Sequence, residues 1–193
     1  MHADGAPPRV GEVTRLLHAA RGGDRDAMNR IVPLIYDDLR VVAERQLRRE
    51  LGARTMHPTS LVHEAYMKVA TGAALQAEDR GHFLAIAARA MRQVLVDDAR
   101  RRSAAKRGLG WERVTLGDRE WGAELTPEEI LALNDAIDGL EPRQRQVVEC
   151  RFFGGMEETE IAATLGITER TVRRDWVKAR AWLYRALYDA PAE

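Results

Sequence analysis

The sequence contains a single cysteine, few aromatic residues and no long uncharged hydrophobic run. Cys150 has no partner cysteine within the chain, so an intramolecular disulfide and a cysteine-rich zinc site are both excluded. The longest apolar-rich stretch, residues 82–96, contains two arginines and is too short to cross a bilayer. The first residues lack the apolar core of a signal peptide. We therefore expect a cytoplasmic protein without membrane insertion.

Strand-like alternation and catalytic signatures are also missing. Alanine, leucine, arginine and glutamate dominate, which is typical of helices. The chain has no phosphate-binding glycine loop, no serine elbow and no kinase motif. His63 and Glu64 lack the second histidine of a zinc-protease helix, and the other histidines are scattered. We expect an all-α protein that is not an enzyme and has no metal, no cofactor and no small-molecule substrate.

The formal net charge is zero, but the charges are unevenly distributed. Residues 89–107 contain seven basic and two acidic residues, and residues 169–180 contain five basic and two acidic ones. Between them, residues 118–141 contain eight acidic residues and one basic residue. The zero is thus a cancellation between two basic segments and an acidic one, and the basic segments are candidates for nucleic-acid contact.

Helical periodicity and glycine-rich breaks predict two helical domains joined by a flexible linker. Asp24 and Asp79 are the expected caps of the second and fourth helices, Pro33 should kink the second, and "TPEE" from Thr126 is a strong helix start. The expected helices are at about residues 11–21, 25–50, 57–72, 80–106, 127–138 and 142–153, followed by a helix-turn-helix. The predicted organisation is a tail at 1–9, a four-helix domain at 10–107, a linker at 108–124, a second domain at 125–188 and a tail at 189–193.

Residues 160–180 have the spacing of a helix-turn-helix motif. Ala162 is a small residue for the helix crossing, Gly166 follows at the turn, and Val172 is spaced to plug the second helix into the first. Charge alone fits equally well a solvated, salt-bridged helix on a bundle, but this spacing favours DNA binding.

The second helix of the motif, expected at 169–183, has an apolar face and a basic face. Val172 and Trp176 lie on the apolar face, and we expect Trp176 to be largely buried. The opposite arginines can contact phosphates or guanine edges. The residues expected to bind DNA are Thr168, Glu169, Arg170, Thr171, Arg173, Arg174 and Lys178.

Two long segments resemble bacterial sigma factors. "LEPRQRQVVECRFFGGMEETEIAATLGITERTVRRDWVKARAWL" resembles the fourth conserved region, which recognises the −35 promoter element. "HFLAIAARAMRQVLVDDARRRSAAKRG" resembles the second region, which opens DNA at the −10 element, and "LVHEAY" resembles its segment that docks on the polymerase clamp. The third domain of housekeeping sigma factors is missing, so the chain resembles the extracytoplasmic-function (ECF) type.

The resemblance assigns −10 binding and melting to the basic helix of the front domain. Spacing places Arg89, Arg92, Val96 and Arg100 on one face of that helix. The alternative is that Arg100–Arg102 only solubilise a helix end, where cations suit the helix dipole. The expected −10 residues are Arg89, Arg92, Gln93, Arg100, Arg101, Arg102, Lys106 and Arg107.

The resemblance also implies partners. Core RNA polymerase would be bound through its β′ clamp and β flap, promoter DNA through both domains, and an anti-sigma factor is left open. The alternative for the clamp-contacting helix is an ordinary polar face of a bundle. The expected polymerase-binding residues are Ser60, His63, Glu64, Met67 and Lys68.

The sequence therefore predicts a sigma factor that binds core polymerase and directs initiation at promoters with −10 and −35 elements. The first alternative is a stand-alone helix-turn-helix regulator with an N-terminal helical interaction domain. A protein-binding helical adaptor is a further alternative, but it leaves the basic face of the last helix unexplained. The charge pattern also predicts that the acidic segment approaches one of the basic helices in the free protein.

Overall fold

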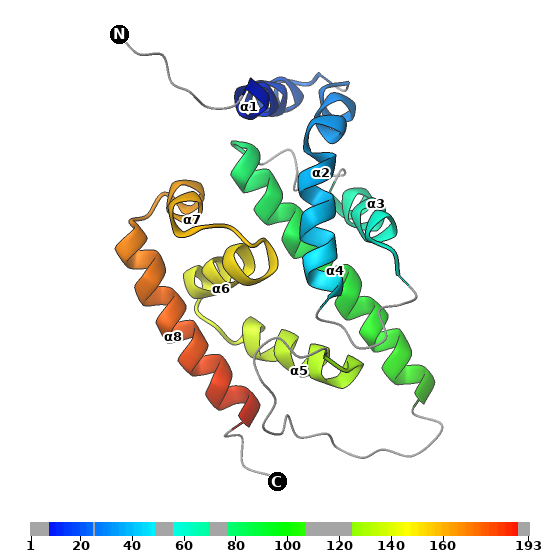
Figure 1. Cartoon of the computed structure of the whole chain (residues 1–193), viewed down its shortest axis with the longest axis vertical. Helices are drawn as coiled ribbons and strands as arrows, with labels where there is room; N and C mark the ends of the chain where they lie inside the picture. The colour runs from blue at the N-terminus through cyan, green and yellow to red at the C-terminus, as the bar shows by residue number, and fades with distance from the viewer. Residues whose placement is uncertain (1–7, 25, 49–55, 70–76, 107–124, 189–193) are drawn as a thin grey trace.

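The structure, a computed structural model, describes residues 8–24, 26–48, 56–69, 77–106 and 125–188, which fold into helices and the turns between them (Figure 1). This confirms the all-α class. We call α1–α4 the front unit and the remaining helices the rear unit. The front unit consists of α1 (Pro8–Arg21), α2 (Ala27–Leu47), α3 (Pro58–Val69) and α4 (Arg80–Lys106). The rear unit consists of α5 (Pro127–Asp138), α6 (Pro142–Val148), η4 (Glu149–Phe153), α7 (Glu158–Leu165) and α8 (Glu169–Tyr188).

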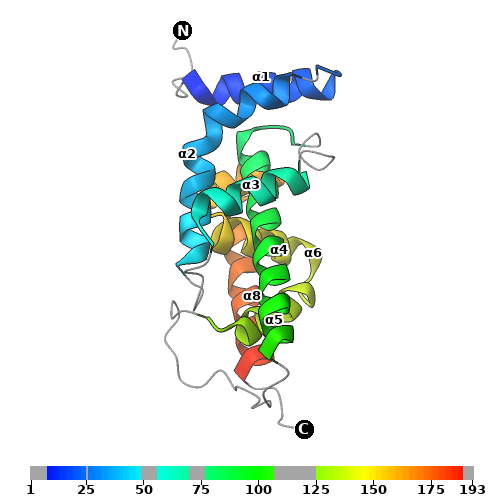
Figure 2. The same ribbon diagram turned by 90° about the vertical axis from the view of Figure 1, so that its right-hand side faces the viewer.

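Two helices of the front unit, α2 and α4, begin beside aspartates that accept hydrogen bonds from backbone N–H groups. The Asp79 carboxylate accepts a hydrogen bond from the backbone N–H of His82 at 2.8 Å, so α4 starts at the predicted residue. Asp24 accepts from the backbone N–H groups of Asp26 and Ala27 at the start of α2. Pro33 lies inside α2, which bends in its first half (Figure 2). α1 starts at Pro8, inside the predicted tail, and the predicted linker and C-terminal tail lie outside the described residues.

The predicted apolar stripes form the core of the front unit. Ile31, Ile35, Leu39 and Val42 of α2 are buried, as the helical spacing requires. They pack with residues of the other three helices in one continuous cluster. Phe83, in α4, is among the largest fully buried side chains. Burial of this apolar area is the main stabilising contribution to the unit.

The rear unit differs from prediction in its second helix. The expected helix at 142–153 is an α-helix only to Val148 and continues as the π-helical turn η4. Its widening is visible in the hydrogen bond from the Gly154 N–H to the Glu149 carbonyl five residues earlier, at 2.9 Å. Thr126 forms the predicted capping box with Glu129 at the start of α5. The extra residue of the π-helical turn η4 leaves no recognisable periodicity in the sequence of so short a helix, so the turn was not predicted.

The two units meet along α4. Figure 1 shows this helix crossing the molecule, with α2 and α3 on one side and the rear unit on the other. Val96 and Ala99 of α4 are buried against Ile130 of α5. The rear unit has its own apolar clusters between α5, α6, α7 and α8, so α4 is shared between two cores.

Candidate nucleic-acid interface

α7 and α8 form the predicted helix-turn-helix. Gly166 ends α7 with φ +64° and ψ +34°, a left-handed conformation that glycine adopts without a steric penalty. The Ile167 N–H then bonds to the Ala162 carbonyl at 3.0 Å, which closes the turn. The Thr168 hydroxyl caps α8 by accepting from the Thr171 N–H at 3.2 Å. The predicted turn and cap are confirmed.

The inner face of α8 anchors the helix in the rear unit. Val172 is fully buried beside Ile161 of α7, as the motif requires. Trp176 packs between the two rear clusters but is only partly buried, less than expected. The Arg151 guanidinium lies 5.0 Å from the centre of its indole ring, which is a cation–π contact.

Asp175 is a second anchor, which the sequence analysis missed. Its carboxylate is buried and accepts hydrogen bonds from Arg143 of α6 at 2.6 Å and from Arg174 at 3.3 Å. Burial raises the pKa of Asp175, but the two arginines outweigh it, so the pKa lies below its ordinary value. The contact joins α8 to α6 and restrains Arg174 at the start of the outer face.

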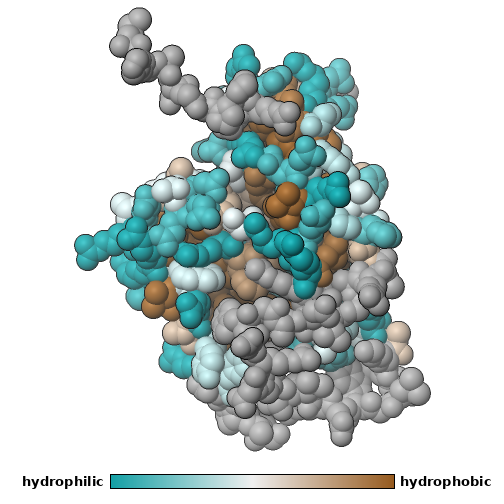
Figure 3. Space-filling model, in the orientation of Figure 1, coloured by the Kyte–Doolittle hydropathy of each residue, from teal (hydrophilic) through white to brown (hydrophobic). Residues whose placement is uncertain are grey.

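The outer face of α8 is exposed and basic. The surface over α7 and α8, at the left of Figure 3, is mostly hydrophilic. Arg173 donates to Glu158 at 2.6 Å and to Glu169 at 3.1 Å, so its guanidinium is held by two carboxylates. These hydrogen bonds raise the pKa of Arg173, and those from Arg173 and Arg151 lower the pKa of Glu158. The exposed residues of the predicted DNA face are Thr168, Glu169, Arg170, Arg173, Arg174 and Lys178, while Thr171 is partly buried.

The predicted −10 residues of α4 divide into exposed and buried positions. Arg100 and Arg101 are exposed at the C-terminal half of the helix, where they pair with Asp97 and Asp98. Arg102 is partly buried and also pairs with Asp98, at 2.8 Å. Arg89 is exposed and Gln93 partly buried. The side chain of Lys106 and all of Arg107 lie outside the described residues.

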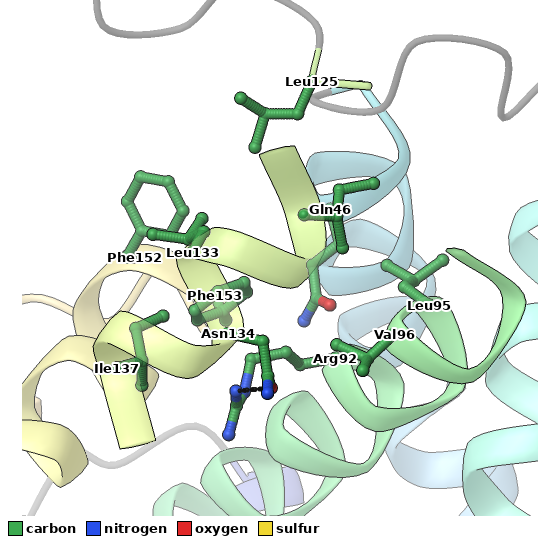
Figure 4. A pocket seen from close by; sticks show the side chains of 11 residues that line it. Gln46, Arg92, Leu95, Val96, Leu125, Leu133, Asn134, Ile137, Phe152 and Phe153 are labelled. Atoms are coloured by element: carbon green, nitrogen blue, oxygen red, sulfur yellow. Dashed lines mark hydrogen bonds between the residues drawn. The ribbon is translucent and has the colours of Figure 1, made fainter. Parts of the chain in front are cut away.

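Arg92, expected at the DNA surface, is instead buried between the units. Its guanidinium donates to the Asn134 side-chain oxygen at 2.5 Å and to the Glu149 carboxylate at 3.0 Å. Figure 4 shows Arg92 and Asn134 joined by this bond among the apolar side chains around them. In this arrangement Arg92 cannot contact DNA. Sequence spacing placed it correctly beside Arg89 and Val96, but it gave no indication that another part of the chain covers that face.

The five predicted polymerase-binding residues lie together on one side of α3. The structure places Ser60, His63, Glu64, Met67 and Lys68 on its exposed face. Met67 is 59% exposed and adds an apolar side chain to this otherwise polar face. The ammonium of Lys68 pairs with Asp97 of α4 at 2.5 Å, which ties this face to the basic helix.

The described residues form neither a metal site nor a membrane-spanning helix. In these ranges no group of three or more His, Cys, Asp or Glu side chains is arranged to hold a metal ion. Within the same ranges, no helix is both long and apolar enough to span a bilayer.

Comparison with known proteins identifies the family. The family model described as ECF sigma factor matches residues 10–189, nearly the whole chain. The chain belongs to the ECF sigma factor family. The predicted family is thereby confirmed, and with it the general role of a sigma factor.

Solved structures give more distant matches. This ECF sigma factor is 20% identical to CnrH, solved in complex with the cytosolic domain of CnrY, with a TM-score of 0.40 over 94% of this chain and 99% of that one. It is 18% identical to the sigma factor RpoE, solved with the anti-sigma factor NepR from Bartonella quintana, with a TM-score of 0.37 over 84% of this chain and 97% of that one. None of the curated proteins matches the chain.

Proposed function

We propose that this ECF sigma factor binds core RNA polymerase and directs it to promoters with −10 and −35 elements. The observation that carries the proposal is the helix-turn-helix of α7 and α8, whose outer face is exposed and basic. In such a motif the second helix enters the major groove and its first turns contact base edges. Arg170, Arg173 and Arg174 are on those turns of α8 and would contact the −35 element.

The front unit supplies the other two contacts of the proposal. The α3 face with Glu64 and Met67 is an exposed mixed polar and apolar surface, which suits a protein partner. The arginines at the C-terminal half of α4 would contact the backbone of opened −10 DNA. Binding of an anti-sigma factor stays a prediction.

Run-off transcription with the core polymerase of the host tests this function. The purified chain should bind core and initiate at promoters found by mapping where the protein and polymerase bind together. Arg173→Ala with Arg174→Ala should lower affinity for −35 duplex roughly tenfold or more, since each removes a cation from the groove-facing turns. The double variant Arg15→Ala with Arg40→Ala is the matched control, because it removes the same charge from exposed positions of the front unit.

Three outcomes would contradict the proposal in whole or in part. Failure to bind core or to initiate at any mapped promoter would exclude a sigma factor. Binding of DNA without binding of core would instead support the stand-alone regulator. Equal −35 affinity of the Arg173/Arg174 variant and the parent would show that α8 uses other residues.

A further inference from the structure

Arg173, one of the arginines assigned to the −35 element, is held by a chain of contacts that begins inside the rear unit. The Arg151 guanidinium lies 5.0 Å from the centre of the Trp176 indole ring. The same guanidinium donates to Oε1 of Glu158, at the start of α7, at 2.8 Å. The other oxygen of Glu158, Oε2, accepts from Nε of Arg173 at 2.6 Å. The chain therefore joins a packed tryptophan to an exposed arginine of the DNA-facing helix.

Glu158 is more tightly held than an ordinary surface glutamate, because both of its oxygens accept hydrogen bonds from arginines. Its side chain is 26% exposed, against 61% for Arg173. The hydrogen bonds from Arg173 and Arg151 lower the pKa of Glu158, so the carboxylate is charged at neutral pH. Charge-assisted hydrogen bonds of this kind are short and directional. Arg173 is thus paired with a carboxylate that is itself anchored.

The hydrogen bonds of Arg173 leave one edge of its guanidinium open. Nε donates to Glu158 and Nη2 donates to Glu169 at 3.1 Å, so both contacts lie along the side edge of the planar group. Nη1 has no hydrogen-bond partner among the described residues. Nη1 and the second N–H of Nη2 form the end edge of the group. Two parallel N–H groups of this kind match the O6 and N7 acceptors of guanine.

Two roles for Glu158 predict opposite effects on DNA binding. A carboxylate beside bound DNA repels phosphate, so loss of Glu158 should raise affinity for every sequence if the residue acts through charge alone. If Glu158 instead orients Arg173, its loss should lower the preference for the one base pair that this arginine contacts. The two roles can therefore be separated by measuring base preference together with affinity.

We propose that Glu158 is a positioning residue for −35 recognition. Anchored by Arg151, it holds the Arg173 guanidinium with the Nη1–Nη2 edge turned to the major groove, where this edge binds a guanine. Glu169 supports the same orientation through its longer hydrogen bond from Nη2. An arginine that is already restrained loses less side-chain entropy on binding. The inference rests on the proposed function and deepens it, because it gives one arginine a base type and assigns its orientation to another residue.

Selection from a DNA library tests the proposal. The full-length protein is bound, without polymerase, to duplexes that carry a randomised segment, and the bound fraction is sequenced. The parent should select a motif in which the preference for one G·C pair is lost in Arg173→Ala. Glu158→Ala should weaken that same preference by about fivefold or more, because a bidentate arginine–guanine contact discriminates by roughly 5- to 150-fold. Glu158→Gln keeps one acceptor oxygen and should retain part of the preference.

Glu160→Gln is the charge-matched control. It removes the same charge from the same helix, and glutamine can keep the capping-box hydrogen bond that Glu160 accepts from the Glu157 N–H at 2.8 Å. It should leave every base preference unchanged. In the Arg173→Ala background, Glu158→Ala should change no preference further, because the arginine that it orients is absent. Circular dichroism of each variant checks that the helices are intact.

Three results would overturn the proposal. Unchanged base preferences in Glu158→Ala, with or without a rise in affinity, would show that Glu158 acts through charge alone. An equal loss of preference in Glu160→Gln would show that orientation by Glu158 is not the cause. A further change of preference when Glu158→Ala is added to Arg173→Ala would show that the effect does not pass through Arg173.

The same selection separates this inference from the proposed function. A parent protein that selects no motif would contradict the −35 role of α8, and the inference would fall with it. A parent that selects a motif which Glu158→Ala leaves intact would contradict the inference alone.

Discussion

Asp175 and Glu149 are carboxylates at positions where the helical pattern alone predicts apolar contact. Each is buried, and each faces an arginine from another helix, Arg143 for Asp175 and Arg92 for Glu149. A buried charge is stable only when such partners replace its water. The partners of these two carboxylates fix how α8 sits on α6 and how the rear unit sits on α4.

Asp175→Asn should lower the free energy of unfolding by about 1.5–3 kcal/mol near neutral pH, since it weakens two charge-assisted hydrogen bonds. The pKa of Asp175 is below its ordinary value of 3.8, so this stabilisation is fully present above pH 3.8. It is lost as the pH falls through the lower folded-state pKa. Urea unfolding from about pH 6 down to about pH 3 measures this window.

The matched control for this prediction is Asp37→Asn, an exposed carboxylate on α2. It should change stability little at any of these pH values. A constant difference between the parent and Asp175→Asn down to the lowest pH would mean that the carboxylate charge contributes nothing.

Sequence reasoning found the exposed residues of the site better than the buried ones. The outer face of α8 and the exposed face of α3 follow from helical spacing, which depends on near neighbours only. The pairing of Arg92 with Glu149 joins residues 57 positions apart, and no local pattern reports it. The sequence does contain one signal, because Glu149 lies inside the apolar run "VVECRFF". A carboxylate in such a run indicates a buried partner of opposite charge, but the sequence does not show which residue that partner is.

At the scale of elements, caps and glycines were the most predictable features. The predicted starts of α4 and α5 are confirmed, because Asp79 and Thr126 hydrogen-bond to backbone groups within three residues. The turn at Gly166 follows from the same short-range chemistry. The π-helical turn η4 was not predicted, because it is stabilised by packing of Phe153 and Cys150 against different clusters rather than by local preference.

The two tryptophans of α8 should differ in their contributions to stability. Trp176 packs between both rear clusters, so Trp176→Ala should destabilise the protein by about 3 kcal/mol, the lower end for a core tryptophan, because the ring is only partly buried. Trp182 is 43% exposed and donates from its indole to the Ala136 carbonyl at 3.2 Å. Trp182→Ala should therefore cost less, and urea unfolding followed by circular dichroism compares the two. Equal losses of unfolding free energy in the two variants would show that the exposed fraction of each tryptophan does not determine its contribution to stability.

At the scale of the molecule, the units should unfold as a coupled pair. The tryptophans all lie at residue 111 or later, so their fluorescence does not report directly on the front unit. Arg45→Ala removes the hydrogen bond from α2 to the Gly154 carbonyl and should lower stability by about 1 kcal/mol. In a background with Trp111 and Trp121 replaced by Phe, tryptophan fluorescence reports on the rear unit. Arg45→Ala should lower the midpoint of unfolding measured by this fluorescence, although Arg45 lies in the front unit.

Arg40→Ala is the control, because Arg40 is on the same helix and its ion pair among the described residues is with Glu44, one turn away. It should leave the fluorescence midpoint unchanged. If Arg45→Ala shifts the circular dichroism transition but not the fluorescence transition, the units unfold independently.

The charge pattern predicted attraction between the acidic segment and a basic helix, and α5 does pack on α4. Of the carboxylates near Arg92, Asp138 belongs to that segment and Glu149 lies outside it. The net charges of the two segments show that they should attract each other. Which residues meet also depends on apolar side chains such as Val96 and Ile130, and a count of charges does not include these. The arrangement of the two units could therefore not be predicted from the sequence.

The π-helical turn makes the contact between the units depend on chain length as well as on composition. η4 spans five residues and contains one more residue than a regular α-helical turn needs. Deleting that residue would rotate everything after it by about 100° relative to α6, because each residue of an α-helix advances the chain by that angle. Gly154 and α7 would then face away from α2 and α4, while Glu149 kept its place. A single-codon deletion here would thus rotate α7 and α8 relative to α4, α5 and α6 without replacing any residue of the proposed DNA-binding face.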